Sequence, residues 1–145
     1  MLAVERPFVL PQGSSRIVLL AFTGPLVPRR GIATALAGEV DGGATIVAAH
    51  LLRVALHLRM DAPVVEGEAR ARELLGAVQA RVAKAGVPAV TRIARGRSYR
   101  HALAVLLADG GYARVVLARP PAFDIGRLVD TVGCELVVVP PERFG

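Results

Sequence analysis

Two short runs of β-branched residues near the end of the chain constrain its fold more than any other feature. The runs are Arg114–Ala118 (RVVLA) and Glu135–Val139 (ELVVV), and one segment with helical character separates them. Strands that are apolar on both faces are typical of a parallel sheet covered by helices on both sides. Parallel neighbours also need a long crossover connection, which usually contains a helix. The end of the chain therefore predicts a strand–helix–strand unit of an α/β protein.

The same alternation of strands and helices extends through the rest of the chain. We predict further strands over residues 16–22, 44–52 and 89–94, and further helices from Pro28 through residues 31–40, over residues 66–85 and over residues 99–108. The strand over residues 89–94 alternates polar and apolar residues, which is typical of a half-buried edge strand. The sum is five strands and four helices, which predicts an α/β fold with a doubly wound parallel sheet and helices on both faces. We expect a flexible arm over residues 1–15 and a single domain over residues 16–145.

Composition limits the core, the compartment and the partners of the protein. The 145 residues are 53% hydrophobic and only 4% aromatic, so the core must be aliphatic. The formal net charge is +6, and all basic residues except Lys84 are arginines, a bias that genome composition explains as well as phosphate recognition does. The single cysteine, Cys134, excludes an intrachain disulfide and is expected to be a buried, inert thiol. No secretory signal and no run of eighteen apolar residues is present, so we expect a cytoplasmic protein that does not bind a membrane.

Several segments, taken in order, carry a resemblance to a known family. They are RIVLLAFTG from Arg16, ATIVAAHLL with His50 near its end, KAGVP before the third strand, HALAVLLADGGYARVVLA ending at Ala118, and Cys134 followed by ELVVVP. This set spans residues 16–140 and resembles the universal stress protein family. The resemblance implies the strand order 3-2-1-4-5, a bacterial stress-response role, and homodimers that often form along the last strand. The resemblance therefore implies that the closing strand of this chain forms the dimer contact.

The sequence departs from the family at the positions that hold nucleotides. The resemblance implies that nucleotide-binding members carry an acid at the end of the first strand, where Thr23 stands here. It also implies a glycine pattern after the fourth strand: Gly, two residues, Gly, nine residues, then Gly with Ser or Thr. Here Ala118 stands where the preceding Gly would be, and Arg119–Phe123 replaces the first glycines. Gly126 is followed by Arg127, and no Gly-Ser pair comes later.

These departures have an energetic consequence for ATP binding. A hydrogen bond to a charged phosphate contributes about 1.5–3 kcal/mol, so losing three or four of them removes on the order of 5–10 kcal/mol. A micromolar complex is worth only about 8 kcal/mol. We therefore expect neither ATP binding of the family type nor any cofactor, and we expect a non-catalytic binding or regulatory module with an unidentified protein partner. Neither an acid–base pair nor a nucleophile–base pair is visible that would make the chain an enzyme.

A second hypothesis is a nucleotide or small-anion sensor with an arginine-lined crest at the point where the first and fourth strands end. Arginine at a helix N-terminus opposes the helix macrodipole, and a bound anion would relieve this conflict. Solvated arginines are the alternative explanation. The candidate ligand-binding residues are Thr23, Gly24, Arg29, Arg30, Ala118 and Arg119.

Three other patterns have a structural explanation that we prefer. Ser98 lies in Gly96–Arg100, which matches the nucleophile elbow of hydrolases only in part. We predict that Ser98 caps the next helix and is not a nucleophile. His50 and His57 have no Cys, Asp or Glu at ligand spacing, which favours a core or edge role over a metal site. Four arginines near the end of the third strand could contact nucleic acid, but only one aromatic residue accompanies them, so we expect a solvated basic edge: Arg92, Arg95, Arg97 and Arg100.

Overall fold

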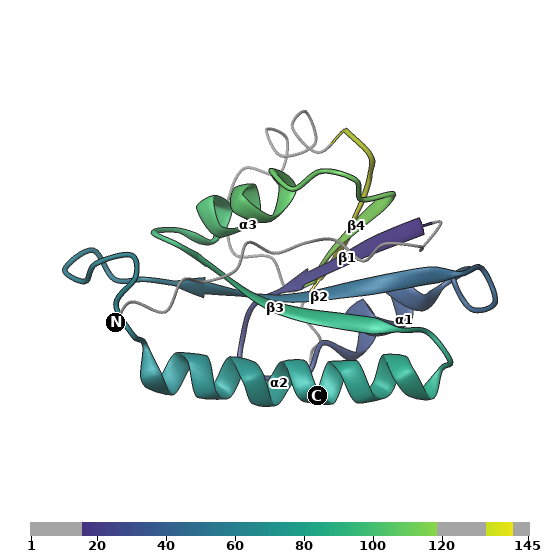
Figure 1. The fold of residues 1–145 in the computed structure, drawn as a ribbon, viewed down its shortest axis with the longest axis horizontal. Helices are drawn as coiled ribbons and strands as arrows, with labels where there is room; N and C mark the ends of the chain where they lie inside the picture. Colours follow the sequence, from purple (N-terminus) through teal and green to yellow (C-terminus); the bar gives the residue numbers. More distant parts are fainter. Residues whose placement is uncertain (1–15, 119–132, 141–145) are drawn as a thin grey trace, which may run out of the picture.

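A computed structural model describes residues 16–118 and 133–140, and its centre is a five-stranded parallel sheet in the order β3-β2-β1-β4-β5 (Figure 1). The strands are β1 (Arg16–Phe22), β2 (Ala44–Arg53), β3 (Ala89–Gly96), β4 (Arg114–Ala118) and β5 (Glu135–Val139). The predicted strand order is thereby confirmed. The predicted bounds of β1, β4 and β5 match the structure, while β2 and β3 extend past their predicted ends.

Helices cover both faces of the sheet, as the doubly wound prediction requires. The three helices of the described residues are α1 (Arg29–Leu36), α2 (Val65–Lys84) and α3 (Tyr99–Leu107). Figure 1 shows α1 and α2 on one face and α3 on the other. The predicted fourth helix and the predicted N-terminal arm lie outside the described residues. One described helix lies between each two consecutive strands from β1 to β4, so each of these parallel strands follows a helical crossover connection.

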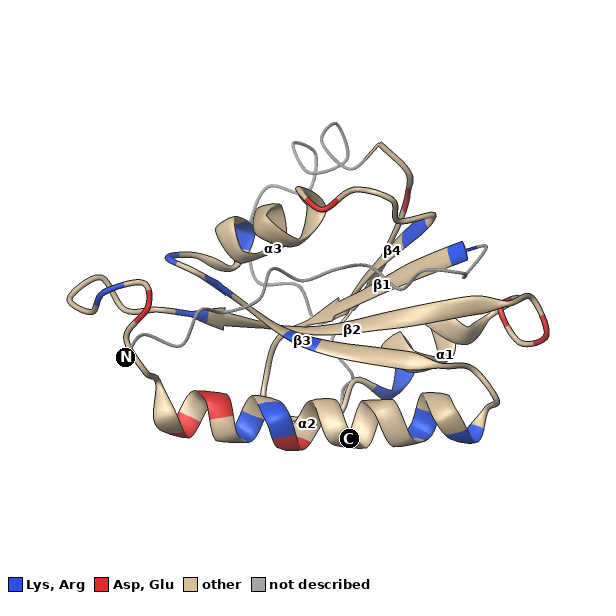
Figure 2. Cartoon of the chain, viewed as in Figure 1, with Lys and Arg blue, Asp and Glu red and all other residues tan. Residues whose placement is uncertain are grey.

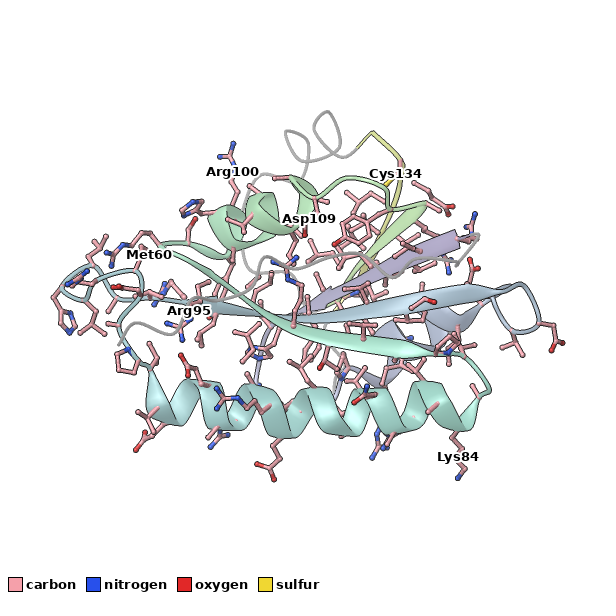
Figure 3. All side chains as sticks on the ribbon, viewed as in Figure 1. Met60, Lys84, Arg95, Arg100, Asp109 and Cys134 are labelled. Carbon is pink, nitrogen blue, oxygen red and sulfur yellow. The ribbon has the colours of Figure 1, made fainter. Side chains whose placement is uncertain are left out.

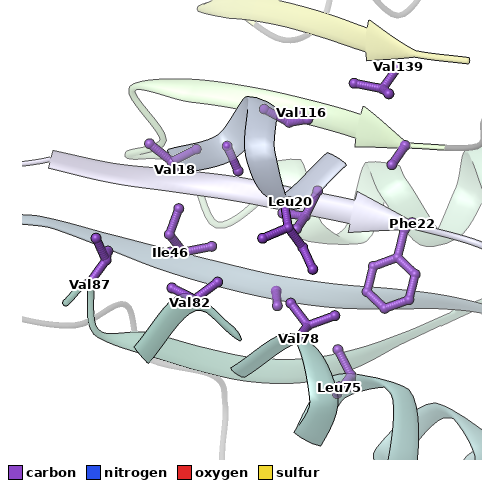
Figure 4. Close-up of a cluster of buried hydrophobic side chains, with 14 of the residues drawn as sticks. Val18, Leu20, Phe22, Ile46, Leu75, Val78, Val82, Val87, Val116 and Val139 are labelled. Carbon is purple, nitrogen blue, oxygen red and sulfur yellow. The ribbon is translucent and has the colours of Figure 1, made fainter. Parts of the chain in front are cut away.

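The strict alternation of side chains along β1 divides the core into two clusters. Val18, Leu20 and Phe22 point toward α1 and α2, where Figure 4 shows them beside side chains of α2. Leu19 and Ala21 point to the other face and pack with α3. All five of these side chains are fully buried. A strand buried on both faces explains why its sequence is an unbroken apolar run.

Charged side chains close the sheet at the amino ends of β1 and β4. The buried carboxylate of Glu39 accepts hydrogen bonds of 2.8 and 3.0 Å from Nε of Arg16. Its Oε1 also lies 3.6 Å from the guanidinium of Arg114, which donates a 2.8 Å hydrogen bond to the carbonyl of Ala35. Arg114 therefore places a positive charge at the C-terminus of α1, where the helix macrodipole favours a cation.

Helix α1 ends earlier than the sequence predicts. We expected it to continue to Val40, but its last residue is Leu36. Gly38 and Asp41 have φ angles of +76° and +72°, which break the helical backbone. The turn that follows lets the side chain of Glu39 reach Arg16 and Arg114. The tertiary ion pairs thus override the weak helical preference of these residues.

The junction between β3 and α3 requires a glycine and a cap. A Cβ atom added at Gly96 would lie 2.4 Å from the backbone nitrogen of Ala102 and 2.7 Å from the carbonyl oxygen of Ser98. The Ser98 hydroxyl accepts a 3.1 Å hydrogen bond from the backbone N–H of His101. The predicted helix cap is therefore confirmed, and the Ser98 hydroxyl has a structural role.

We predict that Gly96→Ala destabilises the protein by at least about 2 kcal/mol, because a methyl group there would overlap backbone atoms that cannot rotate away. The matched control is Gly76→Ala, since a Cβ at Gly76 in α2 meets nothing within 4 Å. Alanine is the better helix former, so the control should gain about 0.5–1 kcal/mol. Urea unfolding of both variants measures the difference, and an equal effect of the two changes would contradict the close approach.

Candidate functional site

The candidate site is the crest, the edge of the sheet where β1 and β4 end beside His50 of β2. Phe22 pairs with His50 of β2 on one side and with Ala118 of β4 on the other. Ligands of doubly wound sheets bind outside the carboxyl ends of the strands, where the strand order reverses. Here the chain runs from β1 outward to β2 and β3 and then returns to β4, so this reversal lies between β1 and β4.

The loop that follows β1 is held by His50, a side chain of β2. Nε2 of His50 lies 3.3 Å from the carbonyl oxygen of Gly24, and this contact makes Nε2 the protonated nitrogen that donates. The imidazole also meets the ring of Phe22 edge to face, with centroids 5.1 Å apart. Gly24 has a φ of +92°, a backbone conformation that favours glycine. The loop between β1 and α1 is therefore anchored at Gly24 by His50.

The second nitrogen of His50 has an unusual environment. Nδ1 is buried and has no hydrogen-bond partner among the residues that the structure describes. Burial lowers the pKa of His50 below its usual value, and the hydrogen bond to the Gly24 carbonyl offsets part of that shift. The neutral ring is thus the form that the fold accommodates. This agrees with the prediction of a core histidine, while the hydrogen bond to Gly24 was not predicted.

The end of β4 is packed closely against α1. A Cβ atom added at Gly31 would lie only 2.7 Å from the Cβ of Ala118, and Ala118 is 1% exposed. The methyl group of Ala118 therefore fills the space between the strand end and the first turns of α1. Thr23, at the end of β1, is also buried. The structure brings Thr23, Gly24 and Ala118 to the same edge of the sheet, as the sequence predicted.

The remaining candidate residues are arginines. Arg29 and Arg30 are exposed and form the start of α1, which has no acidic residue in its first turn and no side-chain cap at Pro28. Figure 2 shows basic residues on α1 beneath the sheet. Arg119 lies outside the described residues. The described part of the crest thus combines buried, uncharged strand ends with exposed positive charge at one helix start.

The arginines near the end of β3 correct our expectation of a solvated basic edge. Arg92 pairs with Asp109, and Arg95 pairs with Glu68 of α2. Arg97 donates a hydrogen bond to the carbonyl of Ala55. The sequence alone did not indicate these contacts, because each partner is distant along the chain. They are structural contacts, and only Arg100 of this group is an exposed side chain.

Cys134 and Tyr112 also have pKa values that their surroundings shift. Cys134 is half-buried rather than buried, and both burial and the nearby Glu135 raise the pKa of its thiol. A raised thiol pKa lowers the thiolate fraction and agrees with the expected lack of reactivity. Burial likewise raises the pKa of Tyr112 to about 12. Within the described ranges, no three His, Cys, Asp or Glu side chains lie close enough together to hold a metal ion.

Comparisons with known proteins identify the fold but no sequence relative. Neither a protein-family model nor a curated protein sequence matches the chain. A solved structure of a universal stress protein family member from Burkholderia pseudomallei superposes with a TM-score of 0.66 at 20% identity, covering 90% of this chain and all of that one. A family protein from Arabidopsis thaliana, solved with AMP bound, gives a TM-score of 0.63 at 14% identity and covers 88% of this chain and 92% of its own. A universal stress protein solved in complex with cAMP gives 0.61 at 16% identity, with 86% and 96% covered.

We predict that the stability of the protein falls as the pH drops below about 6.5, the usual histidine pKa. The folded-state pKa of His50 is lowered, so the unfolded chain binds the proton first and acid favours unfolding. His50→Gln keeps a donor for Gly24 and should reduce the loss of melting temperature between pH 7.5 and 5.5. The control is the exposed His57→Gln, which should keep the wild-type pH dependence. An unchanged pH dependence in His50→Gln would contradict this assignment.

Proposed function

We propose that this chain, which has the fold of the universal stress proteins, is a non-catalytic binding or regulatory module that does not bind ATP in the manner expected for that family. We also propose that it acts in the cytoplasm. No helix of the described residues is long and apolar enough to cross a membrane. The fold alone does not establish whether the protein binds a nucleotide or another partner, so the proposal depends on the geometry of the crest.

The close packing of Ala118 against Gly31 carries the proposal. A phosphate-binding loop needs backbone N–H groups that a ligand can approach, which is why glycines are favoured in such loops. Here the end of β4 carries a buried methyl group, and the neighbouring Thr23 is buried and uncharged. A nucleotide of the family type would meet neither the acid at the end of β1 nor the open glycine position at the end of β4.

The non-catalytic part of the proposal is supported by how the polar groups are used. The donor nitrogen of His50 is engaged by the Gly24 carbonyl, and its other nitrogen is buried. Ser98 caps α3 through the N–H of His101. A general base or nucleophile must be within reach of a substrate, and these two side chains are committed to the fold.

A second candidate function is the sensing of a small anion or nucleotide at the crest. The observation that favours it is the pair of exposed arginines, Arg29 and Arg30, at a helix start without an acidic residue. Two solved structures with the same fold were obtained with AMP and with cAMP. In this alternative the arginines replace the missing glycine loop as the phosphate contact.

We further propose a homodimer that forms along β5. This strand lies at the end of the sheet, and β4 is its pairing partner among the described strands. Leu136, Val137 and Val138 are partly exposed, in contrast to the fully buried strands at the centre. An apolar edge strand invites pairing with another chain, and a second copy offers a strand of the same length and chemistry.

We predict that calorimetric titration with ATP gives no saturable heat at nucleotide concentrations up to about 1 mM, which corresponds to a binding free energy weaker than about 4 kcal/mol. AMP and inorganic phosphate serve as comparators. Binding of phosphate or AMP that is lost in the double variant Arg29→Ala, Arg30→Ala would establish the anion sensor instead. Micromolar ATP binding would contradict the proposed function.

We predict that the wild-type protein sediments as a dimer and that Val138→Asp sediments as a monomer, because a charge at the seam would be buried without a partner. Val105→Asp on α3 is the matched control, since Val105 is also an exposed apolar side chain. It should leave the dimer intact. A monomeric wild type, or a dimeric Val138→Asp, would exclude the β5 seam.

A further inference from the structure

The loop between β2 and α2, residues 54–64, presents an apolar surface to solvent. In Figure 1 this loop projects beyond the end of the sheet, on the left of the view. Leu56 is 85% exposed and Val65, directly after the loop, is 71% exposed, the two highest values among the large hydrophobic side chains of the described residues. Leu58 and Met60 of the same loop are partly exposed. We call Leu56, Leu58, Met60 and Val65 the loop patch.

Hydrogen bonds from the body of the protein anchor both ends of this loop. The backbone N–H of Val54 donates a 2.9 Å hydrogen bond to the carbonyl of Gly96. The guanidinium of Arg95 donates a 2.8 Å hydrogen bond to the carbonyl of Ala62, and that of Arg97 bonds to the carbonyl of Ala55. Both ends of the loop are therefore tied to β3. A loop that is ordered in advance loses less entropy when it binds a partner.

Basic side chains border the loop patch. The guanidinium of Arg53 lies 5.8 Å from the centre of the Tyr99 ring and remains exposed. Arg59 pairs with Asp61, and both side chains are mostly exposed. Figure 2 shows blue segments at the end of β2 and in the loop that follows it. Exposed apolar side chains accompanied by arginine and tyrosine are typical of protein interfaces.

We propose that the loop patch is the docking surface for a protein segment that carries a large apolar side chain next to carboxylates. The apolar side chain would contact Leu56 and Val65, and a carboxylate would pair with Arg53. This inference rests on the proposed function as a binding module and names the surface and the kind of partner.

A protein segment fits this surface better than an anionic membrane does. Basic lipid-binding segments carry clusters of about 4–8 Lys or Arg. Here the exposed acids Asp61 and Glu66 lie in the same segment of the chain as Arg53 and Arg59, and an anionic lipid surface would repel them. A folded or extended polypeptide can place its carboxylates beside Arg53 and avoid the two acids, which a uniform surface cannot do.

The experiment selects binders from a displayed library of short random peptides, using the full-length wild-type protein as bait. The selected peptides should carry an Asp or Glu on one side of a single large apolar residue. Fluorescence anisotropy of a labelled selected peptide should show a loss of affinity of about tenfold or more in Leu56→Glu, and a smaller loss in Arg53→Glu. Higher salt should weaken the wild-type complex.

Matched controls separate this surface from the rest of the protein. Val105→Glu places the same charge on an exposed apolar position of α3, and Arg100→Glu reverses an exposed arginine that Figure 3 shows pointing away from Arg95 and the loop. Both controls should bind the peptide like the wild type, and circular dichroism verifies that all variants are folded. The peptide readout is independent of the ATP titration, so failure of the proposed function at the crest would be recognised separately.

Three results would overturn the proposal. Selected peptides that bind Leu56→Glu as tightly as the wild type would place the docking surface elsewhere. Sedimentation of the wild type, but not of Leu56→Glu, with phosphatidylserine vesicles and without peptide binding would assign the loop patch to a membrane. A dimer that dissociates in Leu56→Glu would assign it to a second copy of the chain.

Discussion

The burial of β1 between two parallel neighbours is the constraint on which the rest of the structure depends. β1 pairs with β2 and β4 along its length, and its side chains are buried on both faces of the sheet. This arrangement places the ends of β1 and β4 beside His50 of β2, so Phe22, His50 and Ala118 meet at the crest. The shape of the described part of the crest is therefore a consequence of the register of the central strands.

The same constraint decides how the polar residues are used. Glu39 is buried between Arg16 and Arg114 at the amino ends of the strands, and His50 holds the Gly24 carbonyl at the carboxyl ends. Polar groups that leave water must find partners inside the protein, and the partners available are those that the sheet brings into reach. His50, which lies at the crest, is consequently a part of the fold. This supports the proposed non-catalytic role.

The elements of the fold could be predicted from the sequence, while many of its tertiary contacts could not. β1, β4 and β5 were located correctly because an unbroken apolar run is a local signal. The cap formed by Ser98 was also local, since its partner is three residues away. The contact of His50 with Gly24 spans 26 positions, and that of Arg114 with Ala35 spans 79. No periodicity in the sequence reports such pairs, so arginines that are internal contacts looked like a solvated edge, and α1 looked longer than it is.

Whether ATP binds at the crest of this universal-stress fold can be measured by a nuclear magnetic resonance titration of the isotope-labelled protein. The backbone amides of Thr23, Gly24, Arg29, Arg30 and Ala118 report on each part of the described crest. If ATP does not bind at the crest, these amide signals do not move when it is added. Saturable shifts of these signals, centred on Gly24 and Ala118, would show that a nucleotide binds at the crest and would contradict the proposed function.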